Sequence, residues 1–256
     1  MYNLSSQLLE QYPFEVIAIQ KGRGTYICTT SEGGKIIIGS FRGSKGRAEA
    51  LEHVLLRLKE NGIEADEIIH TREGEILARE VDETWYYARK YMEGRECETR
   101  SRDDVLATVE ELAKLHLVLQ KVEDENLKIG GQDYAMEVFR HNRELKKVRN
   151  YIHGKHKKNE FEMIFMRNYE IFLKQALDVE HRLMKPNPGE TQGQSGKQSR
   201  EAAMYGICHG DFNQHNVLFT HGKIIITNFE QAHYDVLVGD LAHFLRKLME
   251  KQNHSF

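Results

Sequence analysis

The stretch CHGDFNQHNVLF, residues 208–219, decides the fold of this chain. Within it Asp211 and Asn216 lie five residues apart, directly before an apolar run with the composition of a strand. A loop that leads into a strand can hold both side chains on one side of a small cavity. The stretch therefore predicts a polar site at a loop–strand junction.

The two side chains suit the transfer of a phosphoryl group. Asp211 can accept a proton from a substrate hydroxyl, or orient that hydroxyl for attack. Asn216 offers a carbonyl oxygen, a hard ligand that suits Mg²⁺. A positioning base and a metal ligand are two parts of a phosphoryl-transfer site. The alternative that both residues only form a turn stays open.

Length, charge and hydropathy exclude several classes of protein. The chain has 256 residues, with 36 basic and 39 acidic side chains and a net charge of −3, which argues against a generally basic nucleic-acid binder. No apolar run approaches the 18 or more residues of a membrane span, and the start lacks the pattern of a signal peptide. The three cysteines are far apart, as expected in a reducing cytoplasm. We expect no membrane and no nucleic acid among the partners.

The first third of the chain predicts strands around a single helix. Alternating and β-branched runs, separated by glycine turns, predict strands, and a 3–4 spacing of apolar residues predicts the helix. The predicted strands cover 14–19, 25–30, 35–41, 67–72, 75–80 and 84–92, and the predicted helix covers 44–58.

After Gly94 the pattern becomes helical. Helices are predicted from 101 to about 119, over 135–153 and 160–184, and from 238 to 251, with a small hairpin at 217–220 and 223–227. Residues 185–200 hold two prolines, three glycines and no strongly apolar side chain, and we expect a mobile insertion there. The order predicts a β-rich lobe over 1–92 and a helical lobe over 93–256, with a cleft between them.

The motif at the centre of the chain resembles a known catalytic loop. His209, Asp211 and Asn216 fit the pattern His-x-Asp-x-x-x-x-Asn of the protein-kinase-like fold, and the His-Gly-Asp form is similar to its aminoglycoside and choline phosphotransferase branch. Further stretches resemble the spore coat (CotS-type) members of that branch, namely KGRGTYI (21–27), FRGS (41–44), REGE (72–75), MEGREC (92–97), HNRELK (141–146) and YDVLVGDLAHFLRK (234–247).

This resemblance covers nearly the whole chain, and it implies a fold and a set of site residues. The implied fold is α+β and two-lobed, with a small β-rich N-terminal lobe that has one helix and an α-rich C-terminal lobe. Asp211 and His209 are the implied catalytic residues, although His209 can instead be a hydrogen-bonding scaffold. The implied metal ligands are Asn216 and Asn228, and the implied cofactor-binding residues are Gly22, Arg23, Gly24, Glu49 and Met92.

Two positions depart from the pattern of a working kinase. Asn228 stands where such enzymes carry the carboxylate that chelates Mg²⁺, and an amide brings no charge; Glu230 would have to swing in to replace it. Gly39 stands where a strand lysine would clamp the phosphates. Lys35 is four residues away, about 13 Å along a strand. Each lost group typically costs about 10²–10³ in rate.

Two functional hypotheses follow. The first is a spore coat-associated protein with a degenerate phosphotransferase site and a role in binding or assembly. Its implied partners are other coat proteins or a coat glycan, and its implied locations are the mother-cell cytoplasm and the spore coat. The alternative is an active phosphotransferase that uses ATP and Mg²⁺ on a hydroxyl of a small molecule or glycan. The degenerate form would need neither cofactor.

The end of the chain carries one more expectation. Members of this branch usually continue with further helices, so the resemblance implies an incomplete, truncated C-terminal lobe. The last predicted helix has an apolar stripe formed by Leu241, Phe244, Leu245 and Leu248. We expect a partner to cover this stripe, unless the missing helices do so.

Overall fold

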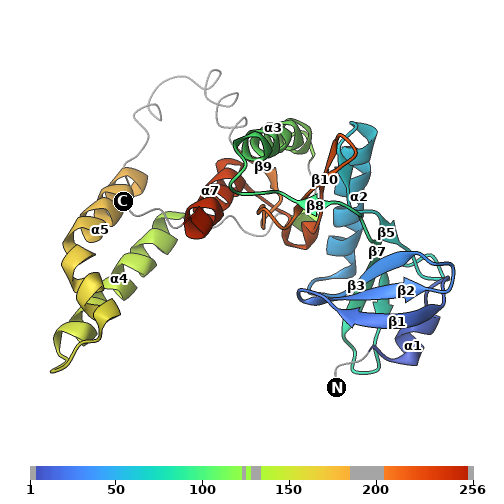
Figure 1. Cartoon of the computed structure of the whole chain (residues 1–256), viewed down its shortest axis with the longest axis horizontal. Coiled ribbons are helices and arrows are strands. Elements are labelled where there is room, and N and C mark those ends of the chain that lie inside the picture. Colours follow the sequence, from blue (N-terminus) through green and yellow to red (C-terminus); the bar gives the residue numbers. More distant parts are fainter. Residues whose placement is uncertain (1–3, 123–124, 128–133, 185–204, 253–256) are drawn as a thin grey trace. The chain divides into compact units, whose positions relative to one another are not determined.

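An antiparallel sheet forms the first part of the chain, because three runs rich in β-branched residues follow one another with tight turns between them (Figure 1). The structure is a computed structural model, and it describes residues 4–122, 125–127, 134–184 and 205–252. The predicted insertion at 185–200 lies outside the described residues.

The register of this sheet positions the later site. The strand order is β1 (Val16–Lys21), β2 (Thr25–Thr30), β3 (Lys35–Phe41), β7 (Trp85–Lys90) and β5 (Ile68–Ile69), and β6 (Leu77–Arg79) also pairs with β7. Gly39 lies opposite Tyr87 on β7, and Ile37 lies opposite Arg89. Residues two apart on a strand share a face, so Tyr87 and Arg89 point the same way. Helix α1 (Ser6–Glu10) buries Leu8 in the small core of this lobe.

Helices α2 and α3 begin where the sequence provides caps. Helix α2 (Lys45–Glu60) begins after Ser44, whose side chain accepts the N–H of Arg47. Helix α3 (Arg102–Leu119) begins after Ser101, whose side chain accepts the N–H of Asp104. Apolar residues at helical spacing line the buried face of α2, namely Ala48, Leu51, Val54, Leu55 and Leu58.

Two small sheets frame the central motif. One has the order β4 (Glu64–Ala65), β11 (Lys223–Ile226), β10 (Val217–Thr220) and β8 (Arg95–Glu96), and in the other β9 (Tyr205–Cys208) pairs with β12 (His233–Val236). The single-turn helices η1 (Glu125–Leu127) and η2 (Phe229–Gln231) and helix α7 (Val238–Gln252) complete this part of the chain. The segment 209–216 is therefore held between the ends of β9 and β10.

One core joins the two predicted lobes. It includes Leu51 and Leu58 of α2, Leu115 of α3, and Phe212 and Phe244, whose rings meet edge to face 5.6 Å apart. Phe244 and Leu248 of the predicted apolar stripe are buried in this core, whereas Leu245 stays 46% exposed.

The chain divides into two compact units. Unit 1 comprises residues 1–129 and 200–256, and unit 2 comprises residues 130–199. Within unit 2, helices α4 (Tyr134–His153) and α5 (Glu160–Met184) pack together, and the side-chain amide of Asn142 donates to the carbonyl of Ala176 and to Glu180. The lobe boundary at residues 92 and 93 stays a prediction. No helix of the described residues combines the length and hydropathy needed to cross a membrane.

Candidate active site

A cleft of about 390 Å³ lies within unit 1. This volume is in the range of small-molecule sites, which is roughly 300–1,000 Å³. Six of the residues that the sequence predicts for the site line it: Gly22, Arg23, Met92, Asp211, Asn216 and Asn228.

Two predicted cofactor-binding residues lie elsewhere. Gly24 has a φ of +72° and shapes the β1–β2 turn without lining the cleft. Glu49 lines a separate pocket with Glu52 and His70, because its face of α2 is turned toward that neighbourhood. Glu52 pairs with His70 at 2.8 Å. The structure therefore corrects the expectation that Glu49 reaches the cofactor site.

Apolar side chains form part of the cleft wall. Ile27 and Ile37 come from neighbouring positions of β2 and β3, and Leu218 comes from β10. Together with Met92 they can flank a flat, apolar group. Sequence reasoning missed the three aliphatic residues, although their alternation along predicted strands was a usable signal.

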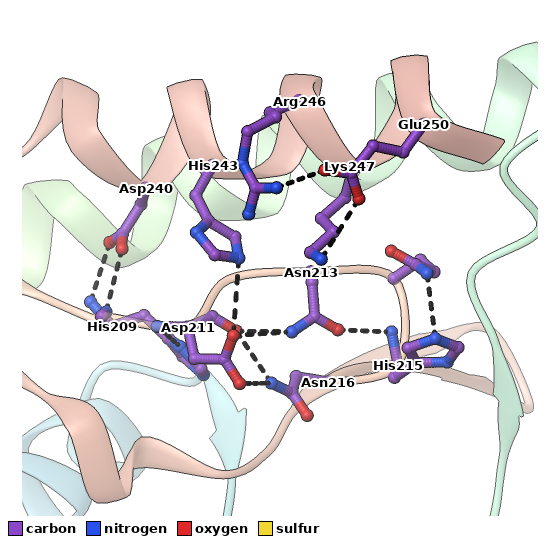
Figure 2. A network of polar contacts seen from close by, with 12 residues as sticks. His209, Asp211, Asn213, His215, Asn216, Asp240, His243, Arg246, Lys247 and Glu250 are labelled. Atoms are coloured by element: carbon purple, nitrogen blue, oxygen red, sulfur yellow. Dashed lines mark hydrogen bonds and ion pairs between the residues drawn. The ribbon is translucent and has the colours of Figure 1, made fainter. Parts of the chain in front are cut away.

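Asp211 is held by two neighbouring amides. Its Oδ1 accepts a hydrogen bond from the Asn213 side chain at 2.9 Å, and its Oδ2 accepts one from the Asn216 side chain at 3.2 Å (Figure 2). The Asp211 side chain remains 36% exposed. The carboxylate is thus oriented and open to the cleft, as a group that receives or positions a hydroxyl must be.

His209 supports the loop 209–216 from the buried side. It is fully buried; its Nε2 bonds the carbonyl of Thr227 at 2.9 Å, and its Nδ1 accepts the backbone N–H of Asp211 at 3.2 Å. Since a carbonyl only accepts and a backbone N–H only donates, the ring carries its proton on Nε2 and is neutral. Burial lowers the pKa of His209, against the charge of Asp240. A scaffold role fits this placement, and a catalytic role for His209 stays a prediction without a supporting contact.

Asp240 anchors the same loop from the first turn of α7. Its two carboxylate oxygens accept the backbone N–H groups of His209 at 2.7 Å and Gly210 at 2.9 Å (Figure 2). The ring of His116 on α3 lies 3.0 Å from one of these oxygens. Burial raises the pKa of Asp240, but the His116 bond and the two backbone N–H groups outweigh it and hold that pKa below its usual value.

His243 brings a second polar group to the carboxylate of Asp211. It lies on α7, one turn after Asp240, and its Nε2 is 3.5 Å from Oδ1 of Asp211 (Figure 2). Sequence reasoning did not identify His243. Its spacing of three residues from Asp240 put both on one helix face, which was the available signal.

A buried arginine lies where the metal carboxylate is missing. Arg89 contacts both oxygens of Asp66 at 2.8 and 3.0 Å, and its Nη2 donates to Oδ1 of Asn228 at 3.3 Å. The backbone N–H of Asn228 also donates to Asp66. Burial lowers the pKa of Arg89, but the charge of Asp66 outweighs it and raises that pKa above its usual value.

These residues do not fit Mg²⁺ at Asn228. The only side-chain oxygen of Asn228 already accepts from a cation, and both oxygens of Asp66 are engaged. Within the described residues, no group of three or more His, Cys, Asp or Glu side chains could hold a metal. Asn216 directs its amide nitrogen to Asp211, so its oxygen alone is left for an ion.

Neither Glu230 nor Lys35 reaches this position. Glu230 does not line the cleft; burial raises its pKa, and its carboxylate bonds the backbone of Arg42. Lys35 is exposed, with its Nζ 5.4 Å from the centre of the Tyr91 ring. Lys90 lines the cleft, but it is exposed and lies near Glu67. The buried cation of the cleft is therefore Arg89 of the adjacent strand and not Lys35 or a lysine at position 39.

The turn between β1 and β2 reaches across the cleft. Arg23 at its tip pairs with Glu96 at 2.9 Å, and Glu96 also contacts the ring of His215. Arg23 is 72% exposed and Glu96 is 44% exposed, so this contact is weak in water. The Arg23–Glu96 contact shows that the β1–β2 turn covers the cleft on the side of β8.

A family of known proteins matches almost the whole chain. The family model described as "APH: Phosphotransferase enzyme family" matches residues 8–256. No curated protein matches the chain.

Several solved structures are similar in fold. An aminoglycoside phosphotransferase from Alicyclobacillus acidocaldarius subsp. acidocaldarius DSM 446 has a TM-score of 0.77 at 17% identity, over 99% of this chain and 74% of that one. The AMP-bound spectinomycin phosphotransferase APH(9)-Ia has a TM-score of 0.60 at 15% identity, over 93% and 75%. Amicoumacin kinase hAmiN has a TM-score of 0.57 at 13% identity, over 100% and 68%. The predicted kinase-like α+β fold is confirmed.

The backbone around Gly210 generates a stability prediction. Gly210 has a φ of +81°, and a Cβ there would lie 2.1 Å from the carbonyl oxygen of Gln231. Gly222 has a φ of +80° and no atom within 4 Å of such a Cβ. We expect Gly222→Ala to cost about 1–2 kcal/mol from backbone strain alone. Gly210→Ala should cost clearly more in urea unfolding followed by the fluorescence of Trp85; equal costs would contradict the close packing of the loop.

The buried ring of His209 generates a pH prediction. Since its folded-state pKa is lowered, the unfolded chain takes up a proton first as the pH falls below about 6.5. The free energy of unfolding should therefore decrease on acidification, by at most about 1.4 kcal/mol per pH unit from this group. We expect His209→Gln to flatten the profile between pH 6.5 and 5, and the exposed control His156→Gln to leave it unchanged. An unchanged profile in His209→Gln would refute the neutral, buried ring.

Proposed function

Because the chain belongs to the phosphotransferase enzyme family, we propose that its cleft binds a nucleotide and transfers the terminal phosphoryl group to a hydroxyl only slowly. The observation that carries this proposal concerns Asn228, which stands at the position of a metal carboxylate. Its side-chain oxygen accepts a hydrogen bond from Arg89. Asp211 and Asn216 keep the pattern of a working site.

Two of the similar structures support a nucleotide as the ligand. The spectinomycin phosphotransferase is bound to AMP, and the amicoumacin kinase is in complex with AMP-PNP, Ca²⁺ and amicoumacin. In this chain the apolar residues Ile27, Ile37 and Leu218 would flank the base. The turn that carries Gly22 and Arg23 would lie over the phosphates.

The acceptor side of the reaction is built around Asp211. Its carboxylate would accept a hydrogen bond from the acceptor hydroxyl and so direct the oxygen at the phosphorus. Asn213 and Asn216 hold that carboxylate in place, and the ring of His243 lies beside it. A divalent ion, when bound, would neutralise phosphate charge; Asn216 is the protein residue left to hold one. The acceptor is then a small molecule or glycan with a free hydroxyl.

The absence of a carboxylate at position 228 would make the transfer slow. Kinases commonly turn over at about 1–100 s⁻¹. Loss of one preorganised electrostatic group costs about 10²–10³. We therefore propose a rate below about 1 s⁻¹ and a main role in binding rather than in turnover.

An assembly role in the spore coat is the second candidate, and it rests on the resemblance of the sequence motifs to coat proteins. Unit 2, taken by itself, favours a binding role. Its helix α5 leaves large apolar side chains half exposed or more, namely Phe161, Ile164, Ile171 and Phe172. Apolar surface of this kind suits contact with another macromolecule. Coat proteins or a coat glycan are the proposed partners.

Hydrolysis of ATP tests the slow site without knowledge of the acceptor. We expect the wild-type protein with MgATP to release phosphate at below about 1 s⁻¹. Asn228→Asp should raise that rate by about tenfold or more, because it adds a carboxylate for the ion. The matched control Asn150→Asp, outside the cleft in unit 2, should have no effect. Fast turnover in the wild-type protein that is lost in Asp211→Ala would refute the proposal.

Localisation tests the assembly role. A fluorescent fusion expressed in a sporulating bacterium should collect at the surface of the developing spore. Paired substitution of Phe161 and Phe172 by Ser should disperse it, whereas Glu170→Ser on the same helix should not. Diffuse fluorescence of the unaltered fusion throughout sporulation would exclude the assembly role and leave the enzymatic proposal standing.

A further inference from the structure

The back of the cleft holds a guanidinium where the family pattern calls for other groups. The side chain of Arg89 is 7% exposed and lines the cleft together with Asp66 and Asn228. These three residues come from three separate segments, namely the link from β4 to β5, strand β7 and the turn after β11. The arrangement is thus a product of the tertiary fold.

The guanidinium has hydrogen-bonding capacity to spare. An arginine carries five N–H donors. Two contacts reach Asp66 and one reaches Asn228. The Nε–H is buried and has no partner among the described residues. The second N–H of Nη2 is also left, so Asp66 fixes the guanidinium without using all its donors.

Gly39 stands at the position of the strand lysine, and side chains of neighbouring strands lie beside it. Gly39 has no side chain, and a Cβ built there would lie 3.5 Å from the ring of Tyr87 and 3.3 Å from Thr25. Tyr87 is 4% exposed and packs edge to face on Phe41. Arg89 follows on the same face of β7, two residues beyond Tyr87. The adjacent strand therefore supplies the cation that β3 lacks.

We propose that Arg89, fixed by Asp66, is the phosphate-binding cation of this cleft and that it lets a nucleoside diphosphate or triphosphate bind without a divalent ion. The inference rests on the nucleotide site proposed above and adds the group that grips the phosphates. The Arg89–Asp66 pair takes the role that a lysine–glutamate ion pair has in kinases.

The chemistry of the two groups supports this role. A guanidinium is always charged and presents its donors in a planar fork that matches phosphate oxygens. An ion pair with a carboxylate does not disqualify it, because the lysine of a kinase is paired in the same way. A Mg²⁺ ion bound to Asn228 would lie beside the guanidinium and be repelled by it. Arginine and metal are thus alternatives at this position.

Calorimetric titration with ADP distinguishes phosphate binding by Arg89 from phosphate binding through Mg²⁺. We expect the dissociation constant in EDTA to lie within about threefold of that in excess Mg²⁺. The double variant Arg89→Gln/Asp66→Asn removes both charges and leaves no buried charge unpaired. It should weaken ADP binding in EDTA by about tenfold or more. Arg89→Lys keeps the charge but loses the fork, and should weaken binding by a smaller factor.

A second arginine–aspartate pair provides the control. Arg95 pairs with Asp104, and neither residue lines the cleft. Arg95→Gln/Asp104→Asn should leave ADP binding unchanged, and thermal melting of each variant shows whether it is folded. Should the Arg89 double variant not fold, the Arg89→Lys titration decides in its place.

The outcomes distinguish this inference from the proposed function. ADP binding that requires Mg²⁺ and is indifferent to the Arg89 variants overturns the inference and leaves the nucleotide site intact. The absence of ADP and ATP binding with and without Mg²⁺ overturns both. Metal-independent binding that is lost with Arg89 supports both.

Discussion

The site depends on the hydrogen bonds that the carboxylate of Asp240 accepts from the loop. A buried carboxylate is stable only when hydrogen bonds replace the water it has lost. Here the replacement comes from two consecutive backbone N–H groups, those of His209 and Gly210, and from the ring of His116. The same hydrogen bonds join α7, α3 and the segment 209–216. They therefore fix the point at which the chain turns to place Asp211 in the wall of the cleft.

The packing around this anchor leaves little freedom to the loop. Gly210 passes so close to the carbonyl of Gln231 that no larger residue fits, and the ring of His209 fills the space beneath. Rigid support of this kind is what a positioned carboxylate requires, because a misplacement of about 1 Å can cost about 10² in rate. The Asp211 carboxylate is thus held in one orientation by Asn213 and Asn216, as the proposed role toward an acceptor hydroxyl requires.

The other half of the cleft has changed its electrostatics. Where the family pattern has a strand lysine and a metal carboxylate, this chain has Gly39 and Asn228, and the Arg89–Asp66 pair contacts Asn228. A fixed guanidinium and a divalent ion both offset phosphate charge, but only the ion can also polarise the transferred group from several sides. This difference is the physical basis of the proposal that the cleft binds a nucleotide and turns it over slowly.

Much of this protein was readable from its sequence. The motif at 208–219, the caps at Ser44 and Ser101, and the periodic apolar positions predicted the main helices and strands, because these signals are local. They also placed Asp211 and Asn216 together, since five residues of a loop cannot separate them far. The short strands β4, β8, β9 and β12 escaped prediction, since two to four residues carry no period of their own.

Only the tertiary structure shows that Arg89 is a buried cation in the wall of the cleft. Arg89 reads in the sequence as one more charged residue on a strand, and Asp66 lies 23 residues before it. Their pairing follows from the register of β5 against β7, in which Ile68 lies opposite Arg89, and the turn after β11 brings Asn228 beside them. A sequence fixes what each segment prefers by itself. Burial and charge pairing across distant segments arise only when the chain has folded, because the desolvation that makes them matter is absent before then.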